Sequence, residues 1–348
     1  MYKAINYILI LTGLISQCCY ALTFTIPSEG NIVGNIQTVI VQNGESLSDI
    51  GKKFDVGVYE MIEANPTLDP WSPLPGESVI VPTQFILPAT KHRGIVINLA
   101  EMRLYYYHSD INLVTTHPIG IGRKGWVTPL IESKVIHKQY NPTWRPPISI
   151  IKEHATKGDH LPTVVPPGPS NPLGEFAIYL SASGYLIHGT NRPGGIGLRT
   201  TSGCIRLFPE DIKSLYSQVS IGTPVKIIHE PYKIGIHNNQ LYIEAHEPLS
   251  DPYYNKESIT VVMQKAIQNA RLLNNMNINN TLNLPYLQEI LQKLAKIANG
   301  YPQLVQVDDY IANRVEQLAE NKLTSTKEEK IKILDNSLEE SSSRYTSS

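Results

Sequence analysis

A glycine-rich stretch from Tyr185 to Leu207 constrains the fold of this chain more than any other segment. It reads YLIHGTNRPGGIGLRTTSGCIRL and carries a histidine, His188, and a cysteine, Cys204. The apolar residues before His188 predict a strand that leads into a turn at Gly189. A loop that returns to this strand would bring a base beside a soft nucleophile, which is the arrangement of cysteine–histidine catalysis.

The other two cysteines, Cys18 and Cys19, lie in the first 21 of the 348 residues. This leader has a lysine near its start, a short apolar run and a small residue, Ala21, at its end, which predicts a secretory signal peptide cleaved after Ala21. A lipidated Cys18 or Cys19 is the alternative. After cleavage we expect no transmembrane span, and Cys204 remains as a lone thiol. A lone thiol in an exported protein is either a buried packing residue or a functional one.

The residues around Cys204 favour the functional interpretation. Gly203 directly precedes the thiol, where the backbone can lie close to a substrate and its N–H groups can bind an oxyanion. Arg199 and Arg206 add positive charge, which favours the thiolate. His188 is the predicted general base, and a pKa near neutrality would suit both of its proton transfers.

These residues resemble the active-site signature of the L,D-transpeptidases, in which a His-Gly pair precedes a Ser/Thr-x-Gly-Cys-x-Asn/Arg block. Here the pattern is met by His188-Gly189 and by Thr201 to Arg206, with Ser202 directly before the Gly-Cys pair. The resemblance implies a multidomain protein with a mainly β catalytic domain, an L,D-transpeptidase-like β-sandwich, over residues 92–230. It implies Cys204 as the nucleophile, His188 as proton donor and acceptor, the Gly189 carbonyl as the group that orients His188, and the Gly203 N–H as an oxyanion donor.

The implied reaction rearranges peptidoglycan stem peptides. Cys204 forms a thioester with a tetrapeptide stem, D-alanine leaves, and an amine of another stem or of an envelope lipoprotein accepts the acyl group. Hydrolysis by water, as in an L,D-carboxypeptidase, and a non-catalytic wall-binding protein are the alternatives. Substrate contacts are predicted for Arg206, Arg199, Ser202, Asn191 and Tyr185.

A small α+β module is predicted over residues 36–83. A strand near Val39, a helix from Leu47, a second helix from Val58 and a strand from Ser78 to Pro82 follow one another, separated by turn signals. This order resembles a LysM domain, which binds the glycan of cell walls. The predicted glycan contacts are Gly44, Glu45, Ser46, Asn65 and Pro66.

Beyond the catalytic domain we expect a β-hairpin over 231–250, a helical extension over 251–336 and a disordered tail over 337–348. The tyrosines at 105–107 predict a half-buried strand face of alternating aromatics rather than a stacking platform.

The formal net charge is −1, so the sequence lacks the excess of basic residues that is typical of proteins that bind nucleic acid. His154 and His160 do not have the spacing of a metal-ligand pair, so we predict no metal and no cofactor. The leader and the two resemblances together predict a periplasmic enzyme bound to peptidoglycan.

Overall fold

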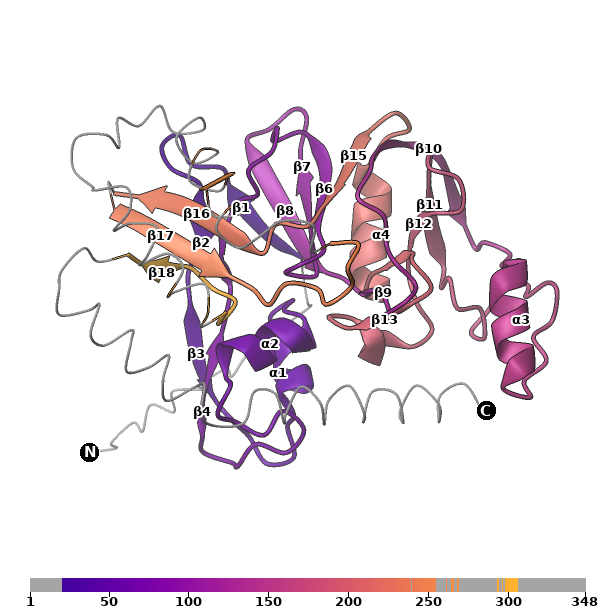
Figure 1. Cartoon of the computed structure of the whole chain (residues 1–348), viewed down its shortest axis with the longest axis horizontal. Coiled ribbons are helices and arrows are strands. Elements are labelled where there is room, and N and C mark those ends of the chain that lie inside the picture. Colours follow the sequence, from indigo (N-terminus) through magenta and orange to yellow (C-terminus); the bar gives the residue numbers. More distant parts are fainter. Residues whose placement is uncertain are drawn as a thin grey trace, which may run out of the picture.

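A computed structural model describes residues 21–238, 240–254 and 298–305, together with positions 261, 264, 265, 268, 293 and 296. The predicted leader up to residue 20, the tail 337–348 and nearly all of the predicted helical extension lie outside these residues. Within the described part of the chain, no helix is both long and apolar enough to cross a membrane. Figure 1 shows the chain as a set of mostly β elements with few helices.

The N-terminal module pairs β3 (Gln37–Ile40) with β4 (Ser78–Val81) and places α1 (Leu47–Lys53) and α2 (Val58–Ala64) beside them. Ser46 begins α1 with a capping box, in which its hydroxyl accepts from the Asp49 N–H and the Asp49 carboxylate accepts from the Ser46 N–H. The module has its own apolar core, formed by Val41, Leu47, Ile50, Val56, Met61, Val79 and Val81.

Ahead of and after the module come β1 (Leu22–Thr25), β2 (Ile32–Gly34) and β5 (Gln84–Ile86). The next part holds β6 (Gly94–Asn98), β7 (Arg103–Tyr107), β8 (Leu113–Pro118), β9 (Ile121–Gly122), β10 (Glu132–Tyr140), α3 (Ile148–Thr156), β11 (Phe176–Leu180), β12 (Leu186–His188), a 3₁₀ turn (Pro193–Gly195), β13 (Arg199–Thr201), β14 (Ile205–Arg206), α4 (Pro209–Gln218) and β15 (Pro224–Ile228). The last strands are β16 (Tyr232–His237), β17 (Gln240–Ala245) and β18 (Gln303–Leu304).

A nine-stranded sheet in the order β1-β8-β7-β6-β15-β10-β11-β12-β14 forms the frame of the predicted catalytic domain. Its two halves meet at β10, whose first residues pair with β15 and whose later residues pair with β11 across a register shift between Val135 and His137. Such an irregularity bends a strand and increases its twist, so one continuous sheet curves around the main core with α4 packed against it. The sandwich-like packing therefore comes from one bent sheet.

The tyrosines of β7 correct one expectation. Tyr105, Tyr106 and Tyr107 are all buried, and not alternately exposed. Tyr106 packs into the main core, whereas Tyr105 and Tyr107 pack into a second core with Val33, Phe85 and Leu87. The segments that flank the N-terminal module cover the second face of β7, and the pattern of β7 alone could not reveal this cover.

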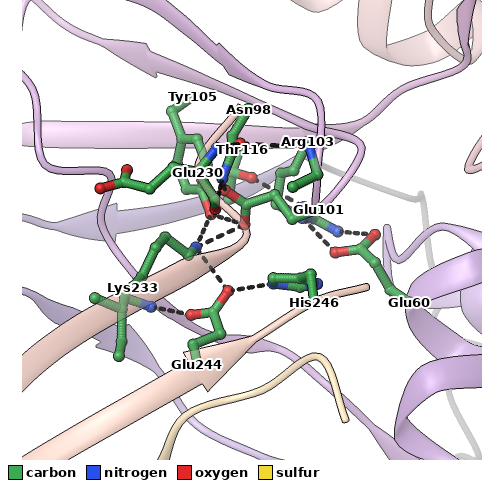
Figure 2. Close-up of polar contacts among 12 residues, drawn as sticks. Glu60, Asn98, Glu101, Arg103, Tyr105, Thr116, Glu230, Lys233, Glu244 and His246 are labelled. Atoms are coloured by element: carbon green, nitrogen blue, oxygen red, sulfur yellow. Dashed lines mark hydrogen bonds and ion pairs between the residues drawn. The ribbon is translucent and has the colours of Figure 1, made fainter. Parts of the chain in front are cut away.

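A buried network of charges joins the parts of the chain (Figure 2). The Lys233 ammonium lies 2.7 Å from a Glu101 carboxylate oxygen and 2.6 Å from a Glu244 oxygen. His246 then bridges Glu244 and Glu63, at 2.9 Å from each. Because Glu63 belongs to α2, Glu101 follows β6, and Lys233 lies on β16, the network ties the N-terminal module, the large sheet and the β16–β17 hairpin together.

A second link runs through Arg103 of β7. Its guanidinium binds both carboxylate oxygens of Glu60 on α2, at 2.7 and 2.9 Å, and donates to the Asp55 carbonyl at 2.9 Å. Arg103 has no exposed surface, and Glu60 is 2% exposed. Bidentate geometry and full pairing of this kind are what allow a buried ion pair to be tolerated.

Candidate active site

Two short parallel strands place the cysteine and the histidine. In the pairing of β12 with β14, Ile187 lies opposite Ile205 and His188 lies opposite Arg206. Both isoleucines point into the main core. Since side chains alternate along a strand, His188 and Arg206 point to the other face. Cys204 directly precedes β14. From the strand rise and spacing, the Cα atoms of Cys204 and His188 lie roughly 8 Å apart, within reach of facing side chains.

The Gly189 carbonyl holds the imidazole of His188. Nδ1 lies 2.7 Å from this oxygen, and the residue is 4% exposed. A carbonyl only accepts, so Nδ1 carries the proton and Nε2 keeps a lone pair for use as a base. Burial and the positive charge of Arg206 lower the pKa of His188 to about 3. The ring is therefore neutral at neutral pH, which corrects the expectation of a pKa near 7.

Cys204 is half-buried and is the only free cysteine among the described residues. Burial raises the pKa of its thiol, and a backbone contact with Leu186 and the charge of Arg206 oppose the shift without cancelling it. The sulfur lies 3.7 Å from the Gly184 carbonyl. The resting pair is thus a thiol and a neutral imidazole, and not the thiolate that the sequence analysis favoured.

The backbone next to Cys204 is fixed by two threonines that sequence analysis missed. Thr201 Oγ1 donates to the Cys204 carbonyl at 2.7 Å and accepts from the Gly203 N–H at 3.1 Å. Thr128 Oγ1 donates to the Gly203 carbonyl at 3.0 Å. The hydrogen bond to Thr201 occupies the N–H of Gly203, so this group is not free for an oxyanion, contrary to the assignment made from the sequence.

The two arginines differ in their surroundings. The Arg199 guanidinium is paired with the Asp251 carboxylate and also donates to the Gly122 carbonyl at 3.3 Å. Arg206 Nε is buried without a hydrogen-bond partner among the described residues. Burial lowers the pKa of Arg206 to about 10, and it stays charged at neutral pH. Arg206, and not Arg199, is therefore the cation available to an anionic ligand.

The other predicted contact residues surround this centre. The Ser202 hydroxyl accepts from Arg123 Nη1 at 2.9 Å, so Ser202 is held by a side chain from the loop after β9. The ring of Tyr185 lies within van der Waals reach of Gly203. Asn191 is exposed in the turn after β12. The structure brings Tyr185 and Ser202 to Cys204 and leaves Asn191 at the rim.

A proline-rich segment closes over the His188 side of the site. Gly174 has φ +67°, and a Cβ there would lie 2.7 Å from the Thr190 N atom, so only glycine fits this close approach. The fully buried amide of Asn171 organises the segment by donating to the Pro142 carbonyl at 2.7 Å and accepting from the Leu173 N–H at 2.9 Å. Apart from its place in a proline-rich run, nothing in the sequence predicted this role of Asn171.

The module residues predicted to bind glycan fall into two groups. Asn65 is buried, and its amide joins α2 to β4 through bonds to the Met61 and Ile80 carbonyls and the Ile80 N–H. Ser46 caps α1, and Glu45 pairs with Lys53. The side chains of Asn65, Ser46 and Glu45 thus have structural partners, which corrects their assignment as free contacts. Gly44 and Pro66 are exposed.

Two buried clusters among the described residues have donor spacing that would suit a cation: Asp55 with His117 and Asp211, and Glu101 with Glu244 and His246. Neither includes Cys204 or His188. The Lys233 ammonium already fills the second cluster. His154 contacts Asp159 at 2.6 Å, and His160 is exposed.

Comparison with known proteins identifies the family. Residues 92–227 match the L,D-transpeptidase catalytic domain (YkuD), and residues 39–82 match the LysM domain. The chain is 46% identical over 238 residues to the "Probable L,D-transpeptidase YcfS" of Escherichia coli strain K12, covering 66% of this chain and 74% of that protein. It is 42% identical over 256 residues to the "Probable L,D-transpeptidase YbiS" of the same strain, covering 71% and 83%.

Among solved structures, the catalytic domain of an E. faecium L,D-transpeptidase is 22% identical, with a TM-score of 0.30 and coverage of 39% of this chain and 96% of that one. The conclusion rests on the curated relatives and the two matched domains. The chain belongs to the L,D-transpeptidase family and is an enzyme of this type, with a LysM domain ahead of its catalytic domain.

Proposed function

We propose that this enzyme acts on peptidoglycan through a thioester on Cys204. The acyl donor is a tetrapeptide stem, the leaving group is its terminal D-alanine, and the acceptor is an amine of a second stem or of an envelope lipoprotein. The observation that carries this proposal is the pairing of β12 with β14, which brings His188 opposite Arg206 and holds Cys204 in the turn directly before β14.

The first step follows from the protonation states. His188 Nε2 accepts the thiol proton as the Cys204 sulfur attacks the carbonyl carbon of the third stem residue. The C–S bond forms, the C–N bond to D-alanine breaks, and the imidazolium returns its proton to the departing amine. Because the imidazole is neutral at neutral pH, its Nε2 lone pair is free to accept the thiol proton.

Two further groups support charge during the reaction. The Cys204 N–H is our candidate for the oxyanion donor, because the Gly203 N–H is bonded to Thr201. Arg206 would bind a carboxylate of the donor stem, since its buried Nε has no hydrogen-bond partner among the described residues and would gain one from such a pair. In the second step the acceptor amine attacks the thioester, the C–S bond breaks, and the thiol is restored.

The LysM domain would hold the enzyme on glycan strands, and the exposed tips at Gly44 and Pro66 are the contacts we favour. A wall-bound enzyme of this kind works in the periplasm, in agreement with the predicted leader. The lone thiol is compatible with an oxidising compartment because it has no second cysteine of the mature chain to pair with.

Mass spectrometry of the products from a tetrapeptide donor, with and without an amine acceptor, tests the proposal. Transfer predicts a cross-linked product that depends on the acceptor and on Cys204. Release of D-alanine with only a tripeptide product would make the enzyme a carboxypeptidase. No turnover of any stem, together with retained binding to sacculi, would leave only a wall-binding role.

A further inference from the structure

A second cluster of ionisable groups lies away from the active site, between the LysM domain and the catalytic sheet. Asp55 follows α1 of the LysM domain, His117 lies on β8, and Asp211 lies in the first turn of α4. All three are buried, with exposures of 4%, 0% and 4%. Their ligating atoms lie within 4.8 Å of one another.

This cluster is short of hydrogen-bond partners. His117 Nδ1 lies 3.3 Å from an Asp211 oxygen, yet neither ring nitrogen of His117 makes a hydrogen bond, and the other Asp211 oxygen also has none among the described residues. Arg103 is near, but its side chain is committed to Glu60. Lys52 and Glu210 border the cluster from its outer side. Buried polar groups left in this way indicate a missing partner.

The charge balance indicates the sign of that partner. Asp211 is hydrogen-bonded to Asp55, and burial raises the pKa of both carboxyl groups, that of Asp211 to about 7. Two adjacent buried carboxylates share one proton because they cannot both ionise, so the pair carries one negative charge. Burial lowers the pKa of His117 to about 4, which leaves this ring neutral. The negative charge that this pair keeps favours a cationic partner.

The backbone nitrogen of Leu22 already reaches this cluster. It lies 3.2 Å from an Asp55 carboxylate oxygen. The position is fixed by β1, which pairs with β8 so that Leu22 lies opposite Thr116, the residue next to His117 (Figure 1). Leu22 is also the residue that follows Ala21, the predicted end of the leader.

We propose that cleavage between Ala21 and Leu22 creates an α-ammonium group that inserts into this cluster and pairs with Asp55. Before cleavage the Leu22 nitrogen is an amide, which offers one neutral N–H. Hydrolysis of the peptide bond adds water across it, leaves the carboxylate on Ala21 and gives Leu22 an amine that takes up a proton. The ammonium then supplies a positive charge and up to three donors at the same place.

The consequence is a link between maturation and domain docking. The ammonium joins the first strand to the LysM domain through Asp55 and, through the shared proton, to Asp211. Asp211 lies four residues beyond Leu207, the end of the active-site segment. A chain that keeps residues ahead of Leu22 makes this contact only through a neutral amide N–H, so the processed form holds its LysM domain and catalytic domain together more firmly than the precursor.

The test compares two purified chains, one that begins at Leu22 and one with a single glycine ahead of Leu22. The extension moves the ammonium by about 3.5 Å and restores a neutral amide at Leu22. We expect the melting temperature to fall by roughly 2–4 °C in the extended chain. Asp55→Asn should lower the melting temperature of the Leu22 chain and have much less effect in the extended chain, whereas Asp110→Asn, at an exposed acid in the β7–β8 turn, should affect neither.

Two further measurements complete the test. The exported protein, expressed with its own leader, should begin at Leu22 by mass spectrometry. Its α-amine should be acetylated at least about tenfold more slowly in the folded than in the unfolded chain, because the ion pair raises the pKa of the amine. A different first residue, equal melting temperatures of the two chains, or equal acetylation rates would overturn the proposal. If the Asp55→Asn variant does not fold, the comparison of the Leu22 chain with the glycine-extended chain, both with Asp55 intact, tests the proposal.

Discussion

The β12–β14 face and the network around Lys233 use buried charge in opposite ways. Lys233 and His246 are paired with Glu63, Glu101 and Glu244 at distances below 3 Å, and the groups come from three parts of the chain. Beside β12 and β14, Arg206 has a buried Nε without a partner in the part of the chain that the structure describes, and His188 and Cys204 are neutral. The paired region holds the architecture, and the region with an unsatisfied cation is left ready for a ligand.

The largest effect should come from breaking the paired region. Lys233→Met leaves Glu101 and Glu244 without their shared cation, which should lower the free energy of unfolding by about 3–5 kcal/mol. Denaturant unfolding of the purified chain measures this loss. Lys226→Met, which removes an exposed partner of Glu132, is the matched control and should lower the free energy of unfolding far less. Equal costs for the two variants would mean that the buried network does not hold the fold.

The next effect separates the two regions by function. Arg206→Gln should reduce kcat/KM for a tetrapeptide donor by roughly 10- to 150-fold, the loss of about 1.5–3 kcal/mol from a hydrogen bond to a charged group. A donor with amidated carboxylates should lose the same factor with the native enzyme and little more with the variant. Independent losses from the two changes would show that Arg206 does not bind a donor carboxylate.

The contribution of the paired region to stability should depend on pH. Burial alone would lower the pKa of His246, but Glu63 and Glu244 outweigh it and raise the pKa to about 10. The folded-state pKa lies above the unfolded value of about 6.5, so this stabilisation is complete below pH 6.5 and is lost as the pH rises toward 10. Unfolding free energies should fall over this window, by at most about 1.4 kcal/mol per pH unit, and His246→Gln should flatten the slope. An unchanged slope in that variant would assign the pH dependence to other groups.

The smallest effect should come from the thiol itself. Because burial raises the pKa of Cys204, its alkylation by iodoacetamide should have a midpoint above the value of about 8.5 for a free thiol. Arg206→Gln should move the midpoint further up, by less than about one pH unit, since the arginine favours the thiolate. A midpoint below 8.5 in the native enzyme would point to a resting ion pair instead of a neutral one.

Sequence reasoning was most successful where the chemistry lies in consecutive residues. The strand before His188, the Gly189 carbonyl beside its ring and the loop that returns to Cys204 all follow from the stretch 185–207. The family assignment from this stretch and from the LysM pattern was confirmed by the comparisons.

The predictions that were wrong concern features that depend on contacts between distant parts of the chain. The buried surroundings that keep His188 and Cys204 neutral come from elements far apart in sequence. The direction in which each pKa shifts could therefore not be predicted from the sequence. Arg199 looked equivalent to Arg206 until Asp251 was seen to pair with it. Helix α3 was missed because its short run follows two prolines, and the complete burial of Tyr105 to Tyr107 depends on a second layer that no strand pattern encodes.

Intact-protein mass spectrometry after mixing with a tetrapeptide donor tests the central claim most directly. We expect an added mass equal to the donor less D-alanine, mapped by digestion to Cys204 and absent from the folded Cys204→Ala variant, which should still bind sacculi. An adduct on another residue, or cross-linking by Cys204→Ala at the native rate, would contradict the assignment of Cys204 as the nucleophile.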